Sequence, residues 1–293
     1  MTFFSEQEHP WEQRDTERER KTAWVIFDLD GVLIRWPRHH LPNEQEQANF
    51  FAGLQSLHES GVGISVLTNR PPAAMQILAY QLGVNHGVWV TESGGSAYNV
   101  SEHKGRVLTK WIETAVTDIP HMRSFLEQSL DITGRNIPAI QFRQAQFEPG
   151  MGWVKTVIVP PEDMSPQEYY QHTLSPLWNT YPYASKFTIG IGKAIDIDPV
   201  GLSKSAGMNS LLALNDIDPH KVPTLFIADA TRDIPAGTTL LAQGGFVGAV
   251  GNASPDFKEA VSSHPRGISA PTDTSYHGSV IHIVNTFLSG RNA

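Results

Sequence analysis

The sequence predicts an α/β protein with a parallel sheet, interrupted by an inserted α+β unit. Over residues 22–95, short apolar runs alternate with segments whose apolar residues recur at helical spacing. This β-α-β-α-β order requires a parallel sheet with right-handed crossovers. Over residues 96–190 the pattern changes to short strand-like runs with two helical segments, and the parallel pattern resumes over residues 191–293. Residues 1–21 have mixed charge and one proline, and we expect them to form a flexible tail.

Each segment of the first part begins and ends at residues typical of its expected structure. Asn43 or proline stands at the start of a helix, and glycine follows its end. Apolar runs that lead into polar clusters are typical of strands buried in a parallel sheet. The expected elements are a strand at 25–27, a helix at 43–60, a strand entering polar residues at 63–70, a helix at 71–83, and a strand and turn at 87–95.

The remaining elements follow from the same signals. In the inserted unit we expect strands at 106–112, 139–144, 154–160 and 187–192, with helices at roughly 113–131 and 165–180. After it we expect a helix at 202–215, strands at 224–230 and 246–252, and a closing helix at 278–288.

Composition excludes several kinds of site and partner. The net charge is −8 and no basic run is present, which disfavours a nucleic-acid partner. The chain has no cysteine, so disulfides, thiolate zinc sites and a cysteine nucleophile are excluded. No run approaches about 18 apolar residues, and the N-terminus lacks the apolar core of a secretion signal. We therefore expect a cytoplasmic protein without a membrane partner, either a monomer or a homodimer.

Two aspartates follow the first strand directly. Asp28 and Asp30 stand two residues apart, and Gly31 comes next. Asp-Gly is a common turn after a strand, which is the ordinary explanation. In open α/β sheets, however, ligands bind beyond the carboxyl ends of the strands. Two carboxylates so close together repel each other unless a cation or a proton relieves them, and a hard metal ion is the natural candidate.

Other polar residues stand at equivalent places in the pattern. The second strand runs into Thr68, Asn69 and Arg70. The strand at 224–230 reaches Asp229, and Asp233 follows four residues later. Lys204 lies at the start of the helix before that strand. Singly, these residues could be caps or exposed side chains, but the ends of parallel strands would bring them to one edge of the sheet.

Four stretches in this order resemble the four motifs of the haloacid dehalogenase superfamily of phosphatases. They are DLDGV at 28–32, VLTNR at 66–70, GLSKSAG at 201–207 and FIADATRD at 226–233. The segment between the second and third motifs and the C-terminal stretch are similar to the sugar-phosphatase branch, which includes sucrose-phosphate, trehalose-phosphate and mannosyl-phosphoglycerate phosphatases. The resemblance covers about residues 23–288 and implies a Rossmann-like core with a large α/β cap inserted at 96–190.

The resemblance also implies roles for the core residues. Asp28 is the expected nucleophile, which forms an aspartyl-phosphate. Asp30 is the expected general acid and base. Thr68, Asn69 and Lys204 are expected to bind the phosphoryl group.

The same resemblance implies a Mg²⁺ cofactor. Its expected ligands are Asp28, the backbone carbonyl of Asp30, and Asp229 or Asp233. One departure from the usual fourth motif bears on this site, because Arg232 stands where the family usually has asparagine. That substitution puts a cation beside the expected metal.

The inserted unit is expected to cover the site and to recognise the leaving group. Its candidate substrate contacts are Arg143, Lys155 and Lys186, although a solvated surface charge is the ordinary explanation for each. Residues 92–95 (ESGG) are expected to form a hinge between the two units. The sequence thus predicts a Mg²⁺-dependent phosphomonoesterase acting on a sugar phosphate or a glycosylated small phosphate. The alternatives are a phosphosugar mutase and a catalytically degenerate protein that binds a phosphate ligand.

Overall fold

The computed structural model describes residues 21–34, 44–70, 72, 75–132, 154–158, 160, 163–192, 195–272 and 276–290. Its centre is a parallel sheet of five strands in the order β11-β10-β9-β1-β2. The strands are β1 (Ala23–Phe27), β2 (Val62–Val66), β9 (Thr224–Ala228), β10 (Phe246–Ala249) and β11 (Gly267–Ser269). Side chains of β1, β2 and β9 are almost all buried, as expected for strands covered on both faces. The predicted parallel α/β core is therefore confirmed.

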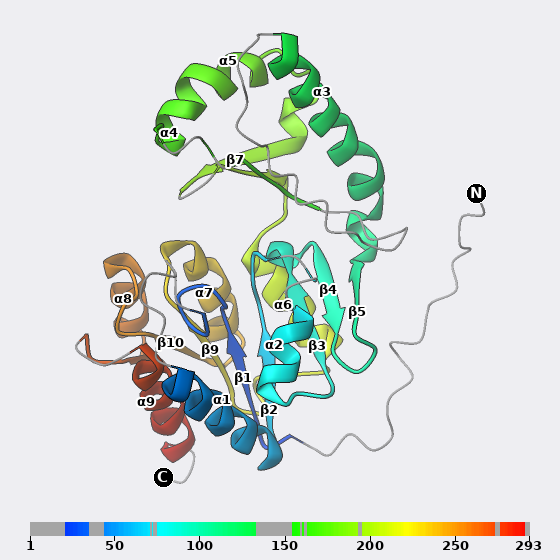
Figure 1. The fold of residues 1–293 in the computed structure, drawn as a ribbon. Coiled ribbons are helices and arrows are strands. Elements are labelled where there is room, and N and C mark those ends of the chain that lie inside the picture. The colour runs from blue at the N-terminus through cyan, green and yellow to red at the C-terminus, as the bar shows by residue number, and fades with distance from the viewer. Residues whose placement is uncertain are drawn as a thin grey trace.

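Helices cover both faces of this sheet (Figure 1). They are α1 (Glu44–Glu59), α2 (Met75–Leu82), α6 (Lys204–Leu214), α7 (Ile234–Ala242), α8 (Pro255–Ser262) and α9 (Tyr276–Ser289). The helices expected at 43–60, 71–83, 202–215 and 278–288 are present with small differences at their ends. Two further helices, α7 and α8, and strand β11 were not predicted. Each described helix is too short or too polar to pass through a lipid bilayer.

The third expected strand does not extend the parallel sheet. β3 (Val88–Thr91) touches the edge of β2 through one parallel bridge, between Leu67 and Val90. Its full ladder is antiparallel and joins it to β4 (Ser96–Asn99), which in turn pairs with β5 (Lys104–Val107). The strand expected at 106–112 ends early, because residues 109–111 form a 3₁₀ turn in which the Trp111 Nε1–H donates to the Gly94 carbonyl at 3.0 Å.

We call the inserted residues the cap. Its antiparallel sheet has the order β6-β8-β7, from β6 (Thr156–Ile158), β7 (Phe187–Ile191) and β8 (Ile195–Pro199). The two expected helical segments are present as a π-helix at Thr114–Asp118 with α3 (Ile119–Ile132), and as α4 (Pro166–Tyr169), a second π-helix (Tyr170–Leu174) and α5 (Ser175–Trp178). The strand expected at 139–144 lies outside the described residues. The cap limit at residue 190 stays a prediction, and the sheet formed by β6, β7 and β8 continues to Pro199.

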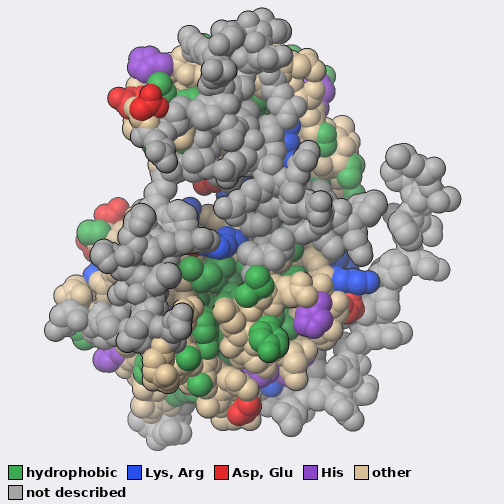
Figure 2. Space-filling view, viewed as in Figure 1, with side chains coloured by type: hydrophobic (Ala, Val, Ile, Leu, Met, Phe, Trp, Pro, Cys, Tyr) green, Lys and Arg blue, Asp and Glu red, His purple; other side chains and the backbone are tan. Residues whose placement is uncertain are grey.

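Core and cap have separate apolar interiors. One buried cluster joins the parallel sheet to its helices, and a second joins α3, the helical segment around α4 and the cap sheet. Figure 1 shows the cap above the carboxyl ends of the parallel strands, and Figure 2 shows basic side chains in the region between the two units. The motif residues at the strand ends therefore face the cap.

Candidate active site

Asp28 is the buried centre of the site. It follows β1 directly, its backbone N–H donates to the Ile227 carbonyl at 2.9 Å, and its side chain is 2 % exposed. Burial is the largest influence on this carboxyl group and raises its pKa, and the neighbouring carboxylates Asp233 and Asp229 act in the same direction. The cation of Lys204 opposes both effects.

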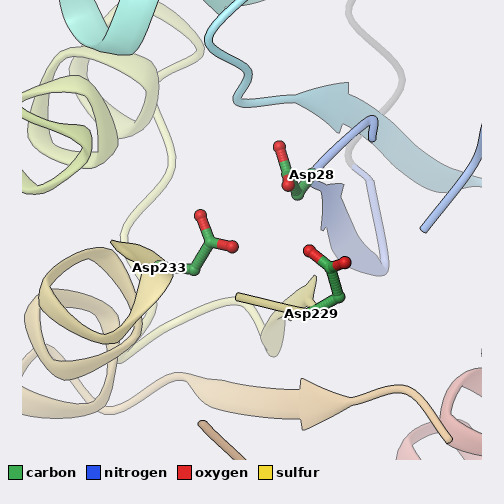
Figure 3. A group of neighbouring side chains, drawn as sticks. All are labelled: Asp28, Asp229 and Asp233. Carbon is green, nitrogen blue, oxygen red and sulfur yellow. The ribbon is translucent and has the colours of Figure 1, made fainter. Parts of the chain in front are cut away.

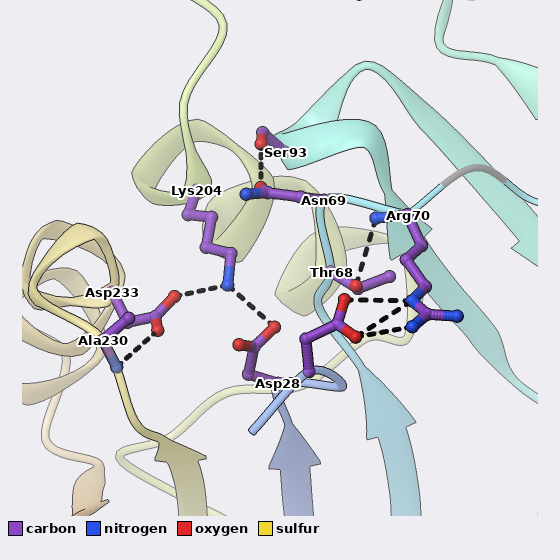
Figure 4. Close-up of polar contacts among 9 residues, drawn as sticks. Asp28, Thr68, Asn69, Arg70, Ser93, Lys204, Ala230 and Asp233 are labelled. Atoms are coloured by element: carbon purple, nitrogen blue, oxygen red, sulfur yellow. Dashed lines mark hydrogen bonds and ion pairs between the residues drawn. The ribbon is translucent and has the colours of Figure 1, made fainter. Parts of the chain in front are cut away.

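Lys204 supplies the positive charge. It is the first residue of α6, where Ser203 caps the helix by accepting a hydrogen bond from the Ala206 N–H at 3.2 Å. Its Nζ lies 2.8 Å from Asp28 Oδ1 and also contacts Asp233 Oδ1 (Figure 4). Burial disfavours the ammonium, but Asp233 and Asp28 outweigh it and raise the pKa of Lys204. The lysine is therefore held charged between two buried carboxylates.

Three carboxylates gather at the ends of β1 and β9. One oxygen from each of Asp28, Asp229 and Asp233 lies within 4.8 Å of the others (Figure 3). Gly31 makes room for Asp229: it has φ +91°, and a Cβ there would lie 1.8 Å from Asp229 Oδ2. The Asn252 side chain donates to the Gly31 carbonyl at 3.1 Å and so holds this turn in place.

These residues fit a hard divalent cation. The three ligands are all carboxylates, which Mg²⁺ prefers. Asp28 Oδ2 is buried and has no hydrogen-bond partner among the described residues, so one donor atom is left for a ligand. Lys204 and Arg232 together bring two positive charges to these three carboxylates, one fewer than their number.

Asp30 is not a member of this carboxylate group. Arg70 holds both of its carboxylate oxygens, with Nη2 to Oδ1 at 2.6 Å and Nε to Oδ2 at 2.9 Å. The side chains of Asp30 and Arg70 are 25 % and 23 % exposed, so a ligand can reach both. Asp30 thus stands two residues after Asp28 in the sequence, but its carboxylate is engaged by Arg70 of the second motif.

The loop after β2 presents the expected phosphate contacts. Thr68 is buried, and its Oγ1 accepts a hydrogen bond from the Arg70 N–H at 3.1 Å. The Ser93 hydroxyl donates to Asn69 Oδ1, which leaves the Asn69 amide nitrogen directed toward Lys204 in Figure 4. The structure therefore brings Thr68, Asn69 and Lys204 to one edge around Asp28.

The candidate cap residues differ from one another. Lys155 is only 4 % exposed and pairs with Asp196 at 3.1 Å and Asp198 at 3.6 Å, so it is not a solvated surface charge. Lys186 is half exposed and pairs with Asp118 at 2.7 Å. Arg143 lies outside the described residues.

Arg232 is the residue that departs from the usual fourth motif. It precedes Asp233 in a 3₁₀ turn at Thr231–Asp233. Burial acts against its charge, but the carboxylates of Asp28, Asp233 and Asp196 raise the pKa of its guanidinium. Its charge therefore interacts with carboxylates of the core and with one carboxylate of the cap.

Three residues near the site have no role assigned to them from the sequence. Arg70 was visible as the last residue of its motif, but its partner Asp30 is 40 positions away. Ser93 and Glu92 belong to the stretch that was predicted only as a hinge. Their contacts depend on how β3 sits beside β2, which no local pattern specifies.

Several solved structures that share this fold are described as hydrolases of the haloacid dehalogenase type. A haloacid dehalogenase-like hydrolase from Bacteroides thetaiotaomicron superposes with a TM-score of 0.60 at 15% identity, covering 91% of this chain and 100% of that one. A sucrose-phosphatase from Synechocystis, solved with sucrose and phosphate, gives 0.57 at 18% identity, covering 91% and 99%. A hydrolase from Plasmodium vivax described as putative and HAD/COF-like gives 0.61 at 16%, covering 92% and 96%. No protein-family model and no curated protein matches the sequence. The chain thus has the haloacid dehalogenase-type fold that its motifs predict.

Proposed function

We propose that this chain is a Mg²⁺-dependent phosphomonoesterase that acts on a sugar phosphate or a glycosylated small phosphate through an aspartyl-phosphate on Asp28. The observation that supports this most strongly is the arrangement at the sheet edge. A buried Asp28 is paired with a buried Lys204 and shares a three-carboxylate group with Asp229 and Asp233. The fold similarity to phosphatases supports the same reaction class.

In the first half of the reaction, a carboxylate oxygen of Asp28 forms a bond to phosphorus while the bond from phosphorus to the leaving oxygen breaks. Lys204, the Thr68 hydroxyl and the backbone N–H of Asn69 hold the non-bridging phosphoryl oxygens. Asp30 must first leave its ion pair with Arg70 and take up a proton from water, and it then gives this proton to the leaving oxygen.

In the second half, Asp30 takes a proton from a water molecule, which attacks the phosphorus of the aspartyl-phosphate. The acyl-phosphate P–O bond breaks, inorganic phosphate forms and the Asp28 carboxylate is restored. Asp28, Asp229 and Asp233 would hold Mg²⁺, which when bound supplies positive charge that offsets repulsion between carboxylate and phosphate.

The substrate class rests on the cap. The core motifs contact only the phosphoryl group and the bridging oxygen, so selectivity for a leaving group must come from another part of the chain. The cap faces the site, and a similar overall fold is found in a sucrose-phosphatase solved with sucrose and phosphate. A cytoplasmic location and a monomeric or homodimeric state remain predictions from the sequence.

The test is a screen of phosphorylated metabolites with detection of inorganic phosphate, in the presence of Mg²⁺. We expect one or a few sugar phosphates to be hydrolysed far faster than nucleotides or phosphoamino acids. A mutase would instead convert one sugar phosphate into its isomer with little phosphate release. A protein that only binds phosphate would show no turnover of any compound above the rate of an Asp28→Asn variant.

A further inference from the structure

The connections between core and cap pass through one small apolar cluster. We call it the hinge cluster, and it consists of Val88, Ala97, Val107, Leu108, Trp111, Ala115, Val154 and Leu202. Leu108 and Trp111 lie between β5 and the first cap helix, Val154 precedes β6, and Leu202 lies between β8 and α6. Every described connection between the two units therefore contributes a residue to this cluster.

Glu92 places a carboxylate beside this cluster. The residue is 1 % exposed. Its Oε1 accepts a hydrogen bond from the Val154 N–H at 3.2 Å, and its Oε2 accepts one from the Ser96 hydroxyl at 2.5 Å. The Ser96 hydroxyl lies 2.8 Å from the Thr91 hydroxyl. One side chain of the core thus holds the backbone of the segment that enters the cap sheet.

The backbone around Glu92 is also constrained. Glu92 and Ser93 have φ of 49° and 57°, which is uncommon for residues other than glycine. A Cβ on Gly95 would lie 2.7 Å from the Val154 Cβ, and one on Gly94 would lie 2.7 Å from the backbone of Gly207 in α6. Strained backbone of this kind persists where surrounding contacts determine it, often at functional sites.

The turn at Glu92 and Ser93 is hydrogen-bonded to the loop after β2, the expected phosphate-binding loop. The Ser93 N–H donates to the Thr68 carbonyl at 3.0 Å, and the Glu92 N–H donates to the Arg70 carbonyl at 3.0 Å. The Ser93 hydroxyl also holds the side chain of Asn69. A shift of this turn would therefore move the expected phosphate contacts.

The segment that Glu92 holds at Val154 continues into the cap. Val154 is followed by Lys155, whose ammonium pairs with Asp196 and Asp198 of β8. Arg123 of α3 donates to the Lys155 carbonyl and to the Thr156 hydroxyl, each at 3.1 Å. The segment that Glu92 holds is thus part of a polar network inside the cap.

We propose that Glu92 is a positioning residue of this site, which couples the position of the cap to the position of the phosphate-binding loop. We call the cap seated when Glu92 accepts the hydrogen bond from Val154. This coupling depends on whether Glu92 is protonated. The proposal rests on the proposed phosphatase function for its effect on catalysis. Its structural part, the hold on Val154, stands independently of that function.

Both protonation states can be accommodated by the contacts present. As a carboxylate, Glu92 accepts from Val154 and Ser96. As a neutral acid, it can donate to the Ser96 oxygen while Ser96 donates to Thr91, and Val154 still donates to Oε1. Burial raises the pKa of Glu92 from 4.5 to about 7, and the hydrogen bonds from Ser96 and Val154 and the charges of Lys155 and Arg123 oppose this without cancelling it.

The direction of the effect follows from linkage. The Glu92 carboxyl group binds a proton more tightly in the seated form than in an open form, in which Glu92 is solvated. The seated form is therefore favoured at low pH. Opening becomes easier as the pH rises from about 4.5 to about 7, and the effect levels off above that range. Each pH unit within the range corresponds to at most a tenfold change in the opening equilibrium.

The experiment measures hydrogen exchange of the Val154 amide against pH, corrected for the intrinsic exchange rate. In the wild-type protein we expect the corrected rate to rise by about tenfold or more between pH 5 and pH 7. Glu92→Gln keeps both hydrogen bonds without a titrating proton and should abolish the rise. Ser96→Ala removes a hydrogen-bond donor to the ionised Glu92 carboxylate, so the rise in exchange rate should shift to higher pH. Glu168→Gln, an exposed cap substitution, should behave as the wild type does.

A catalytic readout accompanies it. KM for 4-nitrophenyl phosphate is measured in the wild-type protein and in Glu92→Gln at each pH. Ionisation of the substrate affects both values equally, so it does not affect their ratio. We expect this ratio to change across the same pH range. An exchange rise that persists in Glu92→Gln would overturn the proposal. If the wild-type protein hydrolyses no phosphate ester, the proposed function fails, while the exchange measurement still decides the role of Glu92.

Discussion

The guanidinium of Arg70 holds both carboxylate oxygens of Asp30, through hydrogen bonds of 2.6 to 3.2 Å between residues 40 positions apart. Asp30 is the residue expected to give a proton to the leaving group. In this arrangement its carboxylate is occupied, so the reaction requires the pair to separate. The pair is about a quarter exposed, so it is accessible from solvent.

Replacement of Asp30 should affect substrates according to their leaving groups. A sugar alkoxide needs a proton as it leaves, whereas 4-nitrophenolate does not. We expect Asp30→Asn to lower kcat for a sugar phosphate by about 100-fold or more, and to leave the initial release of one equivalent of 4-nitrophenolate rapid. Stopped-flow absorbance measures that burst. Asp218→Asn, in an exposed turn, serves as the control, and equal slowing of both substrates would contradict the assignment.

Gly31 should be essential for the position of Asp229. An added Cβ would lie 1.8 Å from Asp229 Oδ2, in a backbone conformation with φ +91° that other residues rarely adopt. We expect Gly31→Ala to destabilise the protein and to weaken Mg²⁺ binding measured by calorimetry. Gly53→Ala is the matched control, because a Cβ on that helix residue has no atom within 4 Å. It should stabilise the fold by about 0.5–1 kcal/mol and leave Mg²⁺ binding unchanged.

Mg²⁺ should both stabilise the protein and be required for turnover. Chelation should abolish phosphate release and added Mg²⁺ should restore it, with Ca²⁺ a poor substitute because its coordination is larger and looser. At about 100 times the dissociation constant, Mg²⁺ should add about 2.7 kcal/mol to the free energy of unfolding. Asp229→Asn should remove most of this gain. Full activity in excess chelator would rule out the metal site.

The two cap lysines should differ in their effect on stability. Lys155 is buried with Asp196 and Asp198, so Lys155→Met leaves two carboxylates without their cation and should lower the free energy of unfolding by about 3 kcal/mol. Lys186 is half exposed, and Lys186→Met should change stability little. Urea denaturation of both variants measures this difference. Similar losses in the two would show that burial of Lys155 is not what makes it important.

The sequence predicts the parts of this structure that depend on local order. Asp28, Thr68, Lys204 and Asp229 stand where apolar runs end or helices begin, and the parallel sheet brings them together. Contacts across long sequence separations were not predictable, because no local pattern links Arg70 to Asp30 or Glu92 to Val154. The third strand was misplaced for the same reason, since its pairing with β4 decides its sheet.

The helices missed near the C-terminus have another cause. Each of these two helices, α7 and α8, has a proline at its first or second position, which is a recognised signal for the start of a helix. α7 is short and largely apolar, so no amphipathic period distinguishes it from a strand or a buried loop. Asp233, which pairs with Lys204, directly precedes the first residue of α7.

The most direct test of the central claim is to trap the aspartyl-phosphate. Asp30→Asn protein, which lacks the base for the second half of the reaction, is mixed with Mg²⁺ and 4-nitrophenyl phosphate, quenched in acid and analysed by peptide mass spectrometry. We predict one phosphoryl group on the peptide that contains Asp28, and none in the Asp28→Asn, Asp30→Asn double variant. A phosphoryl group on a different residue, or full phosphatase activity in Asp28→Asn, would contradict the assignment of Asp28 as the nucleophile.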